Sequence, residues 1–121
     1  MKNITVIPSV QFPKDSIIEL VESQGGYWIK ESGVDHGVID RNQSHIYVAY
    51  CDDVNQEYEP DEINALSECL GGRPQILIDI HIGWAKGSDQ LAKDFADIII
   101  KKWGGFVDDG MEELCVQPTH M

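Results

Sequence analysis

The segment from Ile76 to Ile82 reads Ile-Leu-Ile-Asp-Ile-His-Ile and is the clearest indication of a β-strand in the chain. Isoleucine occupies every second position, and Leu77, Asp79 and His81 occupy the positions between. Because successive side chains of a strand point to opposite faces of its sheet, the isoleucines share one face. The sequence therefore predicts a sheet with one covered apolar face and one more open face that carries polar side chains.

Outward from this strand, the spacing of apolar residues predicts the other elements of the fold. The expected strands are residues 3–10, 27–31, 45–51 and 106–107, and the expected helices are 16–24, 60–70 and 88–102. Ser16 and Glu19 have the spacing of a capping box at the start of the first helix. The polar loop that follows Glu31 has room for a small extra hairpin around Val38 and Ile39.

The order of these elements predicts an α+β fold in a single domain over residues 1–121. It matches a ferredoxin-like split β-α-β sheet with one helix and one strand appended toward the C-terminus. In that arrangement the strand 3–10 separates the strands 45–51 and 76–82. Residues 115–121 are expected to form a flexible tail.

The composition excludes several classes of partner. The 121 residues carry 21 acidic and 9 basic side chains, which gives a formal net charge of -12. Such a charge repels phosphate backbones and anionic membrane surfaces, so no nucleic acid or membrane partner is expected. No apolar run approaches the roughly 20 residues that span a bilayer, and the cysteines lack a Cys-x-x-Cys spacing. We expect a soluble cytoplasmic protein with reduced thiols.

The negative charge is concentrated in two segments of the chain. Residues 52–68 hold seven acids and no base, and residues 105–121 hold four acids and no base. The rest of the chain is nearly neutral, with ten acids against nine bases. In the expected topology both segments lie at the same end of the sheet, so we predict one concentrated negative surface.

Aromatic residues are expected to flank this surface. Tyr50, Tyr58 and Trp84 fall near the same end in the expected topology, and aromatic side chains beside charge are typical of protein-binding surfaces. The alternative interpretation is that Asp61 and Glu62 complement a helix N-terminus and that the other acids form a solvated face.

Candidate chemistry is limited to the open face of the strand 76–82. Asp79 and His81 lie two residues apart on the same face there, an arrangement that could serve a metal site or a general acid–base pair. The predicted strand order leaves the backbones that carry His81 and His45 about 10 Å apart, which is awkward for shared metal ligation. We therefore predict no catalytic residue, no metal and no cofactor. The alternative is a small ligand-binding or enzymatic domain that uses the face around Tyr47, Asp79 and His81.

The last third of the chain carries a resemblance to a known group of proteins. It contains Gly87-Ser88-Asp89-Gln90-Leu91-Ala92, then Phe95-Ala96, then Trp103-Gly104-Gly105-Phe106-Val107-Asp108-Asp109. A small acidic chain with these motifs resembles the immunity proteins of bacterial contact-dependent growth inhibition and related polymorphic-toxin systems. The resemblance implies a cytoplasmic protein that binds one cognate toxin domain and blocks its active site or substrate entry. It allows a homo-oligomer without requiring one.

Many such toxins are nucleases with basic clefts, so an acidic surface would speed encounter and fill the cleft. On this interpretation Tyr58 is an aromatic anchor within the acidic surface. The predicted partner-binding residues are Asp52, Asp53, Glu57, Tyr58, Glu59, Asp61, Glu62, Asp108 and Asp109.

Overall fold

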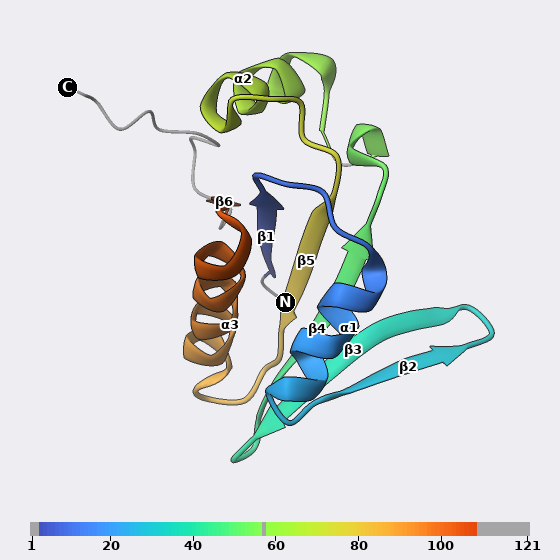
Figure 1. Ribbon diagram of the computed structural model, residues 1–121. Coiled ribbons are helices and arrows are strands. Elements are labelled where there is room, and N and C mark those ends of the chain that lie inside the picture. The colour runs from blue at the N-terminus through green and yellow to red at the C-terminus, as the bar shows by residue number, and fades with distance from the viewer. Residues whose placement is uncertain (1–2, 57, 109–121) are drawn as a thin grey trace.

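Figure 1 shows the structure, a computed structural model that describes residues 3–56 and 58–108. Within these residues, six strands form one antiparallel open sheet in the order β2-β3-β4-β5-β1-β6, together with three α-helices. The predicted α+β class is confirmed, in a single small domain. In chain order the elements are β1 (Asn3–Pro8), α1 (Lys14–Ser23), β2 (Tyr27–Glu31), β3 (Val34–Arg41), β4 (Ser44–Cys51), the 3₁₀ turn η1 (Val54–Gln56), α2 (Pro60–Leu70), β5 (Leu77–Ile82), α3 (Ser88–Trp103) and β6 (Gly105–Asp108).

The strand order differs from the predicted ferredoxin-like split. That fold would place β1 between β4 and β5, whereas β4 and β5 are hydrogen-bonded neighbours and β1 lies between β5 and β6. The path of the chain through α2 explains the difference. This helix lies at one end of the sheet (Figure 1), so β5 begins beside the end of β4, with Cys51 opposite Leu77, and runs back antiparallel. A parallel return would need a crossover along a face of the sheet.

The segment predicted as a polar loop forms most of a strand. β3 pairs with both β2 and β4, so the small hairpin expected around Val38 and Ile39 is a full meander of three strands. The turn between β3 and β4 uses Asn42 and Gln43, both with positive φ (52° and 74°). Two positive φ values in a two-residue loop match the twist of a β-hairpin. In Figure 1 the β2-β3 hairpin extends beyond the rest of the sheet.

The main core covers one face of the sheet. The four alternating isoleucines from Ile76 to Ile82 all belong to it, as predicted. Helices α1 and α3 cover this face, with Ile17, Phe95 and Ile99 fully or almost fully buried.

The opposite face is covered in part. A second buried cluster joins Ile7 and Leu77 of the sheet to Tyr58, Ile63 and Leu66. Because Ile7 and Leu77 alternate with residues of the main core along their strands, this second cluster lies on the other side of the sheet. Helix α2 therefore covers one end of the second face, and the remainder of that face is open.

The helix boundaries refine the predictions. The spacing of Ser16 and Glu19 is not used as a capping box, because α1 begins earlier, at Lys14, after Pro13. A capping box does form at α2, where Glu59 and Glu62 exchange hydrogen bonds between side chains and backbone.

Cys69 is disulfide-bonded, so the expectation of reduced thiols is wrong for this residue. None of the described helices combines the length and apolar character needed to cross a bilayer.

Candidate functional site

The first acidic segment occupies the connection between β4 and β5. Asp52, Glu59 and Asp61 are exposed, and Asp53 and Glu62 are half-buried. We call these five residues the acidic end. Glu57 and Asp109, which belong to the predicted partner-binding set, lie outside the described residues, as does the tail 115–121.

Some acids of this end also support the local backbone. Asp53 accepts a hydrogen bond from the Asn55 backbone N–H at 3.2 Å, and Glu62 accepts one from the Glu59 N–H at 2.9 Å. Asp61 and Glu62 lie in the first turn of α2, where negative charge is favourable. The alternative interpretation therefore accounts for Asp61 and Glu62, and the exposed Asp52 fits the solvated face that it expects.

Tyr58 connects the two acidic segments. Its hydroxyl donates a hydrogen bond to the Asp108 carboxylate at 2.8 Å, across fifty positions of sequence. This contact brings Asp108 to the acidic end, in agreement with the predicted convergence. Tyr58 is only 9% exposed, however, and packs within the second core cluster. Its predicted role as an aromatic anchor on the surface is therefore wrong. Tyr58 is buried beneath the acidic end and links it to Asp108 through the hydrogen bond.

Burial raises the pKa of Tyr58 well above its ordinary value, and the hydrogen bond to Asp108 and the negative charge of Asp79 act in the same direction. The unfolded chain ionises this phenol at a pH of about 10, before the folded chain does. Ionisation therefore favours the unfolded state at high pH, and this contribution to stability is lost as the pH rises above about 10.

Replacing Tyr58 by Phe is expected to change stability in two ways. At neutral pH the free energy of unfolding falls by about 1–2 kcal/mol, because the hydrogen bond to a carboxylate is lost. Above pH 10 the variant loses less stability than the original chain, because the raised phenol pKa is absent. Urea unfolding at pH 7 and pH 10.5 measures both effects. Equal losses of stability in the two proteins above pH 10 would show that the raised pKa of Tyr58 does not contribute to stability.

Of the other two predicted flanking aromatics, Tyr50 lies at the predicted end of the sheet, two residues before Asp52, and Trp84 does not. Tyr50 faces the main core, and its hydroxyl donates to the Phe12 carbonyl at 2.6 Å. Trp84 follows β5, which runs antiparallel to β4, so it lies at the far end of the sheet from the acidic end. The prediction failed because it assumed that β4 and β5 end on the same side.

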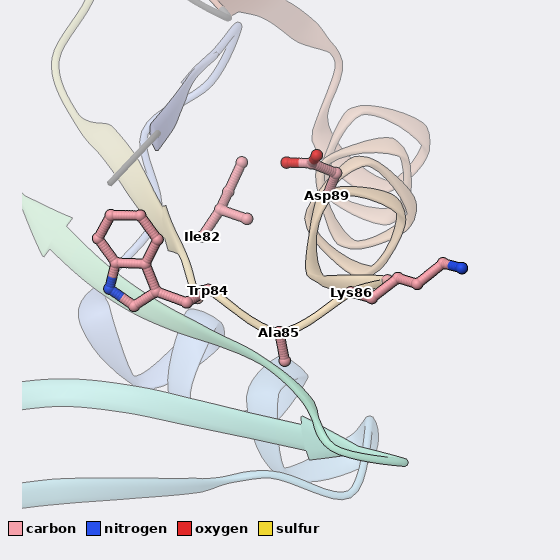
Figure 2. A pocket seen from close by; sticks show the side chains of 7 residues that line it. Ile82, Trp84, Ala85, Lys86 and Asp89 are labelled. Carbon is pink, nitrogen blue, oxygen red and sulfur yellow. The ribbon is translucent and has the colours of Figure 1, made fainter.

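Trp84 is 81% exposed and stands beside a hollow of about 480 Å³. Figure 2 shows Trp84 on one side of this hollow and Asp89 on the other. The loop that carries Trp84 is attached to the start of β4, because Ser44 Oγ donates to the Lys86 carbonyl at 2.8 Å. The His45 N–H donates to Ser88 Oγ at 3.0 Å and strengthens this attachment.

The open part of the second face brings together residues that the sequence had separated. Tyr47 lies opposite His81, and Ala49 lies opposite Asp79, in adjacent strands. The separation of about 10 Å predicted between the strands of His45 and His81 is therefore wrong. Asp79 is almost fully buried and accepts a hydrogen bond from Thr5 Oγ1 at 2.8 Å. The structure shows no group of three or more metal-binding side chains among residues 3–56 and 58–108.

A second hollow, also of about 480 Å³, lies on this open face. Ala49 lines it together with the rings of His36, Tyr47 and His81. His36 belongs to the segment after Glu31 that the sequence predicts as a polar loop, so it was not expected on this face, whereas it lies in β3. The alternation of Val34, His36 and Val38 before a short polar turn was the signal that could have revealed the strand.

The chain was compared with protein-family models, curated proteins and solved structures. The chain matches no protein-family model, no curated protein and no solved structure.

Proposed function

We propose that this chain is an immunity protein that binds and neutralises a cognate toxin domain, of the kind used in bacterial contact-dependent growth inhibition. The expected toxin is a basic, nuclease-type domain, and inhibition occurs when the acidic end occupies its active site or substrate entry. The proposed partner is a protein in the cytoplasm, and the proposal involves no cofactor, metal, membrane or nucleic acid.

One observation carries the proposal: the Tyr58–Asp108 hydrogen bond joins two acidic segments that are distant in sequence. Tyr58 is held by Ile63 and Leu66 in a buried cluster, so the acids around it are attached to a packed support. A preformed negative surface raises the rate of encounter with a positive cleft and needs little reorganisation on binding. Solubility alone would not require the charge to be concentrated in this way.

The test is affinity capture from the bacterium that encodes the chain, using the tagged 121-residue chain at about 50 mM and about 500 mM salt, which lie below and above physiological ionic strength. We expect recovery of a basic protein at low salt and less of it at high salt. Mass spectrometry identifies it, and a nuclease assay with equimolar purified chain tests neutralisation.

Recovery by itself does not decide the question, because an acidic protein collects basic proteins non-specifically. Support requires that the recovered protein is toxic or nucleolytic and that an equimolar amount of this chain abolishes the activity. A recovered protein whose activity is unchanged by the chain, or no recovery at either salt concentration, would contradict the proposal.

A further inference from the structure

The hollow on the open face of the sheet is lined in part by aromatic residues. Its lining includes Ala49, whose position we call the floor, and His36, Tyr47 and His81, whose rings we call the walls; the other lining residues are Gly33, Val34, Asp35 and Val48. Its volume of about 480 Å³ lies in the range of sites that take small ligands or single side chains.

Neighbouring rings hold the Tyr47 ring in place. The His36 ring meets it edge to face with 5.5 Å between centroids, and the His45 ring meets it at the same distance with an interplanar angle of 69°. His45 itself lies directly over Gly83, where a Cβ atom would come within 2.2 Å of its Nε2. The aromatic wall is therefore set before any ligand arrives, and a ligand would not have to order it.

The charge around the hollow is negative. Asp79 lies opposite the floor residue Ala49, and Asp40 lies opposite His45. The acidic end borders the same side of the sheet, because α2 covers the end of this face. Asp35 also belongs to the lining, but its carboxylate lies on the other face of the sheet, where it accepts hydrogen bonds from Trp28 Nε1 at 2.7 Å and from Lys14 Nζ. Among the described strand positions that share this face with Tyr47, none is lysine or arginine.

Aromatic walls in a negative field favour a planar cation. A guanidinium group stacks on aromatic rings and is more weakly hydrated than an ammonium group, so it loses less on leaving water. The Tyr47 hydroxyl can accept its N–H groups, and an anion would be repelled by Asp79 and the acidic end.

We propose that this hollow receives an arginine side chain supplied by the bound protein partner. The inference rests on the proposed function for the identity of that partner, whereas the arginine specificity rests on the hollow. The acidic end attracts the partner from a distance, and the hollow beside it fixes one arginine and so sets the orientation of the complex.

A titration without any partner protein tests the hollow. The probe is N-acetyl-arginine amide, added to the isotopically labelled full chain while amide and imidazole NMR signals are followed. We expect saturable shifts at Ala49, His36 and His81, with N-acetyl-lysine amide binding at least several-fold more weakly. Shifts confined to the acidic end, or equal responses to the two probes, would overturn the proposal.

Matched alanine variants sharpen the test. Ala49→Leu fills the floor of the hollow without changing the charge, and Ala65→Leu adds the same atoms on the exposed surface of α2. We expect Ala49→Leu to abolish saturable arginine binding and Ala65→Leu to preserve it. Should Ala49→Leu fail to fold, His81→Ala removes an exposed wall residue and is expected to weaken binding at least several-fold. Unchanged binding in a folded Ala49→Leu or in His81→Ala would overturn the proposal.

The two proposals fail separately. Arginine binding with no neutralised toxin would leave the hollow as a guanidinium site and remove the immunity role. Toxin neutralisation without arginine binding at the hollow would keep the immunity role and restrict the interface to other surfaces.

Discussion

Replacing Asp52, Glu59, Asp61 and Glu62 by their amides is expected to slow association with the neutralised toxin by about 10-fold to 1000-fold at low salt. The acids act through their summed field, so the association rate changes more than the dissociation rate. The amides retain the size of the acids and an acceptor oxygen, and glutamine at position 62 is compatible with the capping box at α2. Stopped-flow association at several salt concentrations measures the effect, and the salt dependence of the variant should be flatter.

A matched variant separates local charge from net charge. Asp15, Glu19, Glu22 and Asp97 are exposed on α1 and α3, which cover the other face of the sheet. Their amides change the net charge by the same amount and are expected to reduce the association rate far less. If both variants associate at the same rate, net charge rather than the acidic end is responsible, and the proposed interface is wrong.

The second large effect is expected in the core. Phe95 is 2% exposed at the centre of the face of α3 that packs on the sheet. Truncation to Ala should lower the free energy of unfolding by about 3–5 kcal/mol, because apolar contacts are lost and a cavity remains. Since small domains are stable by only about 5–15 kcal/mol, this loss removes a large part of the total.

Urea unfolding followed by tryptophan fluorescence measures this loss, because Trp28 and Trp103 pack partly buried against the same core. Lys93→Ala, on the exposed side of the same helix, serves as the control and is expected to change stability by less than about 0.5 kcal/mol. A loss below about 1.5 kcal/mol for Phe95→Ala would mean that neighbouring side chains collapse into the space, and would contradict close packing of this core.

The sequence allowed prediction of the acidic residues but not of the buried cluster around Tyr58 that lies beneath them. Asp52, Asp61 and Asp108 could be identified because acidic residues without nearby bases are visible in the sequence. The burial of Tyr58 could not be predicted, because the segment 52–59 shows no helical or strand periodicity, and the side chain is buried only because α2 folds over Ile7 and Leu77. Trp84 was misplaced by the assumed direction of β5, because reversing this strand moves the residues just after its C-terminal end to the other end of the sheet.

The sequence by itself determined which residues of β5 face the core and where α2 and α3 form, because strand alternation and helical periodicity are local properties of the chain. It also determined that the negative charge is concentrated in two segments. Only the tertiary structure decided that β4 and β5 are neighbours, that Tyr58 is buried and bonded to Asp108, and that His36, Tyr47 and His81 line one hollow together with Ala49. Strand order and register arise from contacts between residues far apart in sequence, here through α2 at the end of the sheet. Local periodicity is the same for every such order, so it cannot select among them.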